Sequence, residues 1–339
     1  ASMTASAPDP APRPSLSVVL ATIDNYQRIE RTLDHYRAQT ARAEIEVLIV
    51  ASSKEALDLD PAVDERFFDF RVIEVGEIHS LSAAKALAVA EAKADCVVFG
   101  EDHSWPEPGW AEAIIEAHKV GYAMVGPIIE NANPGSILSW TNYLACFSRW
   151  SHAGLAGQVP QTPWHNTSYR RADLMERQDN LRRLLAVEGI LQDELLEKGL
   201  KAFLLPEVST NHINISRFSS WVLQAFWGGK LYGGSRVEGE DWGMLRRLIY
   251  ICGAPLIPIV RLKRLLPEIR PLTQQYSLMP KILPALVLNL LFHALGEVSG
   301  YILGKGDAED RYLEFEARRF EAISEKDRRE LGVLPPSSG

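Results

Sequence analysis

Three side chains that can bind a cation stand next to one another in the tripeptide Glu101-Asp102-His103. The two carboxylates are ligands for hard cations such as Mg²⁺, and the imidazole nitrogen also suits Mn²⁺. A divalent cation held there could neutralise a diphosphate leaving group. The alternative is a solvated turn whose acids cap the next helix, because prolines suited to a helix start follow directly. The tripeptide by itself leaves both interpretations open.

Short apolar runs separated by helical patterns predict the elements that position this turn. Strands are predicted at 16–21, 46–51, 70–75 and 95–100, and helices at 29–38 and 81–94. This alternation predicts an α/β fold with a Rossmann-like, mixed but mainly parallel sheet flanked by helices. Ligands of such sheets bind at the carboxyl ends of the strands, so the turns at Thr22, Ser52 and Glu101 should share one edge.

Beyond residue 110 the pattern is less regular. We predict a helix to about residue 121, a strand at 124–129, irregular chain at 131–163, a helix at 177–199 and a strand at 202–206 that leads to His212. The sheet is therefore expected to continue into this part of the chain.

Three segments of the first half carry a family resemblance. They are SVVLATIDNYQRIERTLDHYRAQT, EVLIVASS and SLSAAKALAVAEAKADCVVFGEDHSWPEPGW, and together they resemble the nucleotide-binding half of inverting family 2 glycosyltransferases with a GT-A fold. In that family two strand ends hold the nucleoside, and an Asp-x-Asp turn holds the metal and the diphosphate. The resemblance implies a GT-A type fold, a nucleoside-diphosphate sugar as donor and Mn²⁺ or Mg²⁺ as cofactor.

The resemblance also assigns roles position by position. The positions matched to the nucleotide are Thr22, Asp24, Ser52, Lys85 and Asp102, and those matched to the cation are Glu101 and His103. Ser52 stands where the family usually has an aspartate for the base or ribose. The usual Asp-x-Asp is Glu-x-His here, and both replacements remain cation ligands, with His103 favouring Mn²⁺.

Two carboxylates compete for the role of general base. Inverting transfer requires a carboxylate that takes the proton from the acceptor hydroxyl. The resemblance favours Glu188, because its spacing to Gly199 and Pro206 follows the family, whereas Asp193 lies some five residues too close to Gly199. The alternative for either residue is an exposed carboxylate on a helix.

Two more polar residues are assigned by the same resemblance. His212 follows a predicted strand where the family often has a histidine near the diphosphate and metal. Asn166, with His165 beside it, lies in a small polar motif before an Arg-rich helix, where it would suit a sugar or nucleotide. A purely structural role is the alternative for each of them.

An uncharged run followed by basic residues marks the start of an apolar C-terminal third. Residues 248–260 carry no charge, and Arg261, Lys263 and Arg264 follow at once. Such a flank resembles an interfacial anchor attracted to anionic lipid. Burial of the run against the catalytic domain is the alternative.

A second apolar run, at residues 283–303, is long enough to cross a bilayer. Asn289, His293 and Glu297 recur in it every fourth residue and share one helical face, which argues against a lone spanning helix. A membrane-surface helix, a core-covering helix and a homo-oligomer interface all remain open.

Composition limits the classes of partner and location. The 339 residues have a formal net charge of −8, which does not suit a nucleic-acid partner. The three cysteines are far apart, so a reducing, cytoplasmic location is expected, with peripheral contact to the inner face of the membrane as an option. The expected division is a disordered leader at 1–14, a GT-A domain at 15–218 with nucleotide-binding (15–126) and acceptor (127–218) halves, a helical, partly apolar C-terminal extension at 219–330 and a disordered tail at 331–339.

The predicted function is inverting transfer of a sugar from a nucleoside-diphosphate sugar to a hydroxyl acceptor, either a glycan or a lipid-linked glycan. One alternative is a sugar nucleotidyltransferase, although such enzymes usually have a Gly-rich loop after the first strand and ATIDNYQR has no glycine. Another is a non-catalytic relative that binds a nucleotide or a partner, in view of Ser52 and the altered Asp-x-Asp turn.

Overall fold

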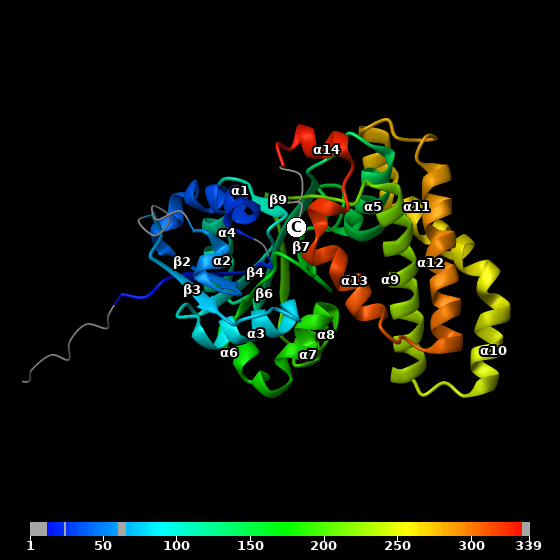
Figure 1. Ribbon diagram of the computed structural model, residues 1–339, viewed down its shortest axis with the longest axis horizontal. Coiled ribbons are helices and arrows are strands. Elements are labelled where there is room, and N and C mark those ends of the chain that lie inside the picture. The colour runs from blue at the N-terminus through cyan, green and yellow to red at the C-terminus, as the bar shows by residue number, and fades with distance from the viewer. Residues whose placement is uncertain (1–11, 24, 60–65, 334–339) are drawn as a thin grey trace, which may run out of the picture. The chain divides into compact units, whose positions relative to one another are not determined.

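The computed structural model describes residues 12–23, 25–59 and 66–333 (Figure 1). Asp24 and most of the predicted leader and tail therefore lie outside the described residues. By compactness the chain divides into two units, described one at a time below. The first contains residues up to Asp102, Pro108–Gly126 and Pro160–Phe203; the second contains His103–Glu107, Pro127–Val159 and the chain from Leu204 onward.

Four parallel strands form the first part of the sheet, where the sequence predicts them. In spatial order they are β3 (Asp69–Glu74), β2 (Ile45–Ala51), β1 (Leu16–Ala21) and β4 (Cys96–Gly100). All residues of β2 and β4 are buried, as expected for parallel strands covered on both faces. The four strands thus end on one edge, which carries the turns after β1, β2 and β4.

Antiparallel pairs complete the sheet, so the predicted mixed α/β fold of GT-A type is confirmed. Beyond β4 the order is β8 (Ser168–Arg170), β6 (Met124–Asn131), β9 (Ala202–His212) and β5 (Ser104–Pro106), and β7 (Gly157–Val159) also pairs with β9. β8 is antiparallel to β4 and to β6, and β5 is antiparallel to β9.

The helices of the first unit follow the predicted alternation, with one difference. They are α1 (Tyr26–Arg37), α2 (Lys54–Leu57), α3 (Leu81–Glu91), α4 (Trp110–Lys119), α6 (Arg171–Met175), α7 (Leu181–Ala186) and α8 (Glu188–Glu197), with 3₁₀ turns at Thr40–Glu44 and Gln178–Asn180. The helix predicted at 177–199 is broken at Val187, whose backbone leaves the helical region. Glu188 is therefore the first residue of a new helix.

The second unit contains a helix where irregular chain was predicted. Its helices are α5 (Ile137–Phe147), α9 (Phe218–Gly239), α10 (Met244–Gly253), α11 (Ile257–Gln275), α12 (Leu283–Leu303), α13 (Ala308–Ala317) and α14 (Glu325–Glu330), with short 3₁₀ turns at 148–150, 254–256 and 319–321. The prediction for 131–163 was wrong because Gly and Pro on both sides hide α5, which Ser136 caps by accepting from the Ser139 amide at 3.1 Å.

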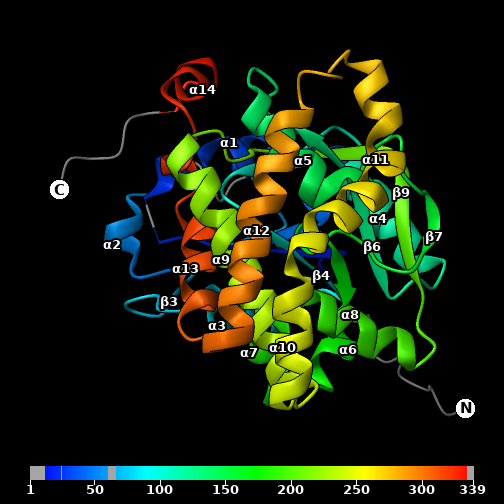
Figure 2. The same cartoon turned by 90° about the vertical axis from the view of Figure 1, so that its right-hand side faces the viewer.

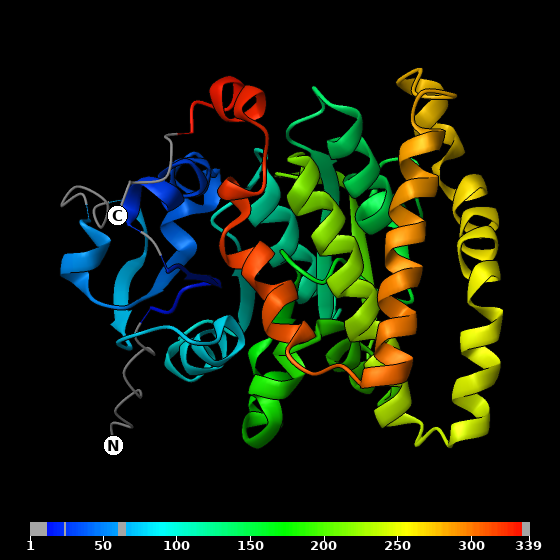
Figure 3. The ribbon, with the colours of Figure 1, turned by 45° about the vertical axis from the view of Figure 1, so that its right-hand side comes forward.

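Glycines let α9 and α12 pack backbone to backbone (Figure 2). A Cβ on Gly229 would lie 2.0 Å from the His293 carbonyl oxygen, and one on Gly296 would lie 2.0 Å from the Phe226 carbonyl oxygen. The other flank of α12 faces α10 and α11 (Figure 3). By length and composition α12 could cross a membrane, yet 44% of its most apolar window is buried within the structure.

Candidate active site

A glycine and a threonine hold the acidic turn after β4. A Cβ on Gly100 would lie 2.5 Å from the Tyr36 hydroxyl oxygen and 2.8 Å from a Leu20 methyl carbon, so only glycine fits there. The Thr32 hydroxyl donates to the carbonyl oxygens of Glu101 at 3.3 Å and of Asp102 at 3.4 Å. Both carboxylate residues are buried, 7% and 9% exposed, so this is a packed turn rather than a solvated one.

Within the first unit, Glu101 contacts two residues of the polar motif before β8. The Asn166 side-chain amide donates to Glu101 Oε2 at 3.1 Å, and His165 Nδ1 lies 3.5 Å from Glu101 Oε1. Asn166 has a left-handed backbone (φ +63°), which asparagine tolerates better than most residues, and its backbone N–H donates to the Phe99 carbonyl oxygen at 3.1 Å. This backbone geometry turns the motif toward the end of β4.

Glu188 belongs to the same buried group. Its carboxylate accepts from the Tyr169 hydroxyl at 3.1 Å and lies 3.5 Å from Lys85 Nζ and 3.6 Å from His165 Nδ1. The Gln192 amide donates to the Tyr169 hydroxyl at 3.0 Å and fixes its direction. Helix α3, strand β8 and helix α8 therefore deliver Lys85, Tyr169 and Glu188 to one place.

Electrostatics in this group favour a charged imidazole. Burial lowers the pKa of His165, but the carboxylates of Glu101 and Glu188 outweigh it and raise that pKa to about 9. Burial also raises the pKa of Tyr169 well above its ordinary value, and the nearby Glu188 charge adds to this effect. The group thus combines two carboxylates with two cations and a neutral phenol.

Asp193 does not reach this group. Five residues along α8 correspond to about 500° of rotation, which places Asp193 roughly 140° around the helix from Glu188. Its side chain is exposed and accepts from the Gln161 amide at 2.9 Å. Of the two candidates for the general base, only Glu188 thus belongs to the buried group.

Thr22 and Ser52 lie where β1 and β2 end. The Thr22 amide donates to the Val50 carbonyl at 3.0 Å, and the Ser52 carbonyl accepts from the Gly76 amide at 3.1 Å. Thr22 is buried and Ser52 is half-buried. Both residues therefore lie on the sheet edge that also carries the turn after β4.

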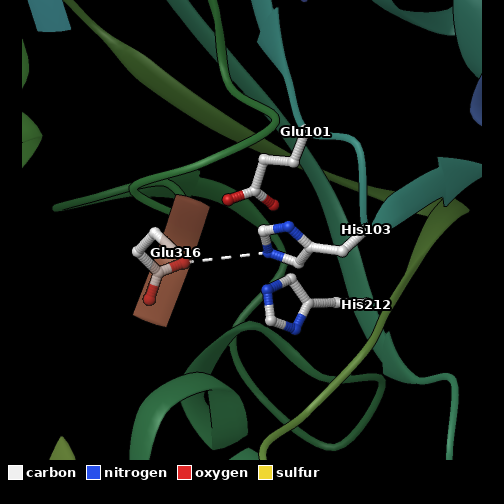
Figure 4. Close-up of side chains that lie close together, drawn as sticks. All are labelled: Glu101, His103, His212 and Glu316. Carbon is white, nitrogen blue, oxygen red and sulfur yellow. Dashed lines mark ion pairs between the residues drawn. The ribbon is translucent and has the colours of Figure 1, made fainter. Parts of the chain in front are cut away.

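A second polar group, in the second unit, consists of His103, His212 and Glu316 (Figure 4). Strand pairing sets Ser104 opposite His212, and the Ile213 amide donates to the His103 carbonyl at 3.1 Å, so the two imidazoles meet with ring centroids 5.0 Å apart. Glu316 comes from α13, and its Oε2 lies 3.7 Å from His103 Nε2. Their ligand atoms all lie within 4.8 Å of one another.

The donor set of this second group fits a divalent cation. Donors around a cation with bonds of about 2.2 Å lie up to about 4.4 Å apart, so the observed spacing needs only a small inward movement. Two imidazoles with a carboxylate suit Mn²⁺ better than Mg²⁺. Arg319 pairs with Glu316 Oε1 at 2.5 Å and leaves Oε2 on the side of His103.

Sequence reasoning missed Glu316 and Tyr169. Glu316 lies in a charged segment typical of a solvated helix, and no spacing relates it to the acidic turn. Tyr169 lies in a three-residue strand whose residues give no catalytic signal. Only packing brings either residue to its group.

Three solved structures are similar to the chain. GalNAc-T7 with UDP, GalNAc and Mn²⁺ is 13% identical, with a TM-score of 0.45 over 59% of this chain and 43% of its own. The mannosyltransferase PcManGT from Pyrobaculum calidifontis in complex with GDP-Man and Mn²⁺ is 16% identical, with a TM-score of 0.44 over 96% and 81%. S. aureus TarS 1-349 in complex with UDP is 15% identical, with a TM-score of 0.46 over 85% and 91%. The chain thus spans less than half of the first of these proteins.

A family model decides the assignment. No curated protein is similar enough to the chain to count as a match. The model of the family described as glycosyl transferase family 2 matches residues 17–183, which contain β1 to β4, the acidic turn and the Asn166 motif. Residues 17–183 are therefore a family 2 glycosyltransferase domain.

Proposed function

We propose that the protein transfers a sugar from a nucleoside-diphosphate sugar to a hydroxyl acceptor, with inversion at the anomeric carbon and with the help of a divalent cation. The observation that carries this proposal is the position of the acidic turn in two buried polar groups. Glu101 contacts Asn166 and His165 in the first, and His103 lies with Glu316 in the second. One short turn therefore supplies side chains to both groups.

The donor is proposed to bind along the edge that carries the turns after β1, β2 and β4. Thr22 and Ser52 would contact the nucleoside, and Asp102 would lie at the nucleotide edge. Lys85 is a buried cation within the first group, and an ammonium there suits a phosphate oxygen. Asp24, which the family resemblance also matches to the nucleoside, lies outside the described residues.

His103, His212 and Glu316 are the residues proposed to hold the cation, with Glu101 as a further ligand. When bound, the cation would neutralise charge on the leaving diphosphate. Arg319 would orient the Glu316 carboxylate through its 2.5 Å ion pair. The burial of both imidazoles excludes competing water from their nitrogens.

Glu188 is proposed as the general base. An inverting transferase needs one carboxylate that takes the proton of the acceptor hydroxyl as it attacks. The Tyr169 hydroxyl orients Glu188 Oε2, while Lys85 and His165 lie on the side of Oε1. This arrangement would hold the carboxylate in one rotamer before the acceptor arrives.

The acceptor is proposed to be a hydroxyl group of a glycan or of a lipid-linked glycan. The family match favours a transferase over a sugar nucleotidyltransferase. The buried Glu188 carboxylate beside a lysine and a histidine favours an enzyme over a non-catalytic relative. Removing these charged groups from water costs folding free energy, and a catalytic role would explain that cost.

The test is a reaction with nucleoside-diphosphate sugars and simple glycosides, with Mn²⁺ or with a chelator. UDP and GDP sugars come first, since the solved structures named above contain UDP or GDP-Man. We expect release of nucleoside diphosphate only with the cation, and a product whose anomeric configuration is opposite to that of the donor by NMR. Release of pyrophosphate would instead indicate a nucleotidyltransferase.

A pair of variants on one helix tests the base. Glu188→Gln should lower the transfer rate about 10²- to 10⁴-fold while nucleotide binding, measured by thermal shift, is retained. Asp193→Asn is the matched control, because it removes an exposed carboxylate from the same helix, and its rate should stay near that of the wild type. The reverse ranking would transfer the role to Asp193.

A further inference from the structure

The helices α10, α11 and α12 expose an unusual amount of apolar surface. Leu245 is 74% exposed, Ile249 61%, Ile259 63% and Leu295 58%. These residues come from all three helices of one part of the second unit, which are adjacent in Figures 2 and 3. We call this surface the α10–α12 face. Contiguous apolar surface of this kind marks an interaction site.

Every exposed residue of α12 is apolar. They are Pro284, Leu288, Leu291, Leu295, Ile302 and Leu303. Most of them recur three or four positions apart, so they form a stripe along one face of the helix. The opposite face is packed against α9 through Gly296 and Gly300 and contains the buried Asn289 and Glu297. The outward face of α12 is thus apolar, whereas the outward face of a helix on the surface of a globular protein is usually polar.

A groove opens between α12 and the α10–α11 segment. It has a volume of about 490 Å³ and an almost wholly apolar lining, to which Ile251, Pro258, Leu291 and Leu295 contribute. Leu291 and Leu295 belong both to this lining and to the exposed stripe. The groove and the stripe are therefore continuous, and a hydrocarbon chain is the ligand class that such a lining accepts.

Basic residues accompany this apolar surface. Residues 244–281 contain seven basic residues and one acidic residue, a formal net charge of +6 in a chain whose total is −8. Arg246 is paired with Glu240, and Arg261 is paired with Glu297 at 3.1 Å. Lys263, Arg264 and two others, Arg270 and Lys281, are exposed, and within the described residues no ion pair involves them. On α11, Lys263 and Arg264 follow the exposed Ile259 and Val260 by four residues each, so positive charge and apolar side chains lie on one side of this helix.

We propose that the α10–α12 face binds the surface of an anionic lipid bilayer, with a hydrocarbon chain in the groove between α12 and α10–α11. The basic residues favour a negatively charged partner, each contributing attraction to anionic headgroups. A second copy joined through this face would set the same positive charge against itself in a two-fold contact. α12 lies along the bilayer surface rather than across it, because its inner face is packed on α9 and carries Glu297.

This inference does not depend on the transferase reaction, because vesicle binding is measured without donor or acceptor. The full chain is mixed with vesicles of phosphatidylcholine, with or without phosphatidylglycerol, and bound protein is separated by flotation. We expect binding to the vesicles with phosphatidylglycerol, weaker binding at high salt, and little binding to phosphatidylcholine alone.

Two double variants test the two components of the face. Lys263→Gln with Arg264→Gln should weaken binding about 30-fold, since each basic residue contributes about 1 kcal/mol. Leu291→Gln with Leu295→Gln should weaken it at least about tenfold. Both pairs are at the surface, so thermal unfolding should remain close to that of the wild type.

The matched controls replace residues of the same two kinds, exposed basic and exposed apolar, in the first unit. Arg182→Gln with Lys201→Gln removes two exposed charges, and Val120→Gln replaces a side chain that is 77% exposed. Neither should alter vesicle binding. The proposal is overturned if these controls weaken vesicle binding as much as the variants of the α10–α12 face do, or if the protein does not bind anionic vesicles. It is equally overturned if the chain forms a stable dimer that the Leu291 and Leu295 changes dissociate.

Discussion

A methyl group added to Gly229 should destabilise the second unit. The new Cβ would lie 2.0 Å from the His293 carbonyl oxygen, 2.8 Å from its carbonyl carbon and 3.0 Å from the Glu297 amide nitrogen. All three atoms belong to the backbone of α12, so no side-chain rotation can relieve the overlap. The two helices must move apart by about 1 Å or more to restore ordinary contact.

The expected size of the effect follows from two opposing contributions. Replacing Gly by Ala within a helix stabilises it by about 1 kcal/mol. Overpacking costs about 1 to 3 kcal/mol, and the rigid backbone on both sides puts this site at the upper end. Gly229→Ala should therefore lower the free energy of unfolding by about 2 kcal/mol. Contacts at Gly233 and Gly296 would be lost as well, because they depend on the same distance between α9 and α12.

Gly239→Ala provides the control for helix propensity. Gly239 ends α9, and a Cβ there would meet nothing within 4 Å. This change should leave stability unchanged or raise it by up to about 1 kcal/mol. The assay is urea unfolding followed by tryptophan fluorescence, to which Trp221 and Trp227 of α9 contribute. If Gly229→Ala proved as stable as Gly239→Ala, the backbone-to-backbone packing of α9 and α12 would be refuted.

Two further predictions concern the first unit. His118 is buried and bonded to Ser168 at 2.8 Å and to the Tyr122 carbonyl at 2.9 Å, and burial lowers its pKa to about 4. Since the unfolded pKa is about 6.5, its contribution to stability is complete above that pH and is lost as the pH falls toward 4, by up to about 3 kcal/mol. The free energy of unfolding, measured with denaturant at about pH 7 and pH 4.5, should thus fall more for the wild type than for His118→Asn. An equal fall in both proteins would contradict this. Gly100→Ala should destabilise the first unit by about 1 to 3 kcal/mol, because its Cβ would overlap Tyr36, and should weaken the proposed Mn²⁺ binding. The control Gly243→Ala, whose Cβ would meet nothing within 4 Å, should do neither in thermal-shift and Mn²⁺ titrations.

The parallel half of the sheet could be predicted from the sequence because its signals are local. Runs such as Leu16–Ala21 and Ile45–Ala51 are apolar on both faces, and a strand of this kind needs helices on both sides. The acidic turn could be identified for the same reason, since it directly follows such a run. Helix α5 was missed because the Gly and Pro residues around it predict irregular chain, while its burial comes from the rest of the unit.

The membership of the two polar groups was decided by tertiary structure. Sequence spacing favoured Glu188 over Asp193 as the base, but it could not show which carboxylate is buried; the helix that starts after Val187 carries Glu188 into the first group and leaves Asp193 exposed. Glu316 lies at the far end of the chain from His103, in a helix whose charges look solvated, and packing of α13 sets it there. A residue's type and local period determine which element it joins, whereas the partners of its side chain depend on contacts between distant segments that no local pattern encodes.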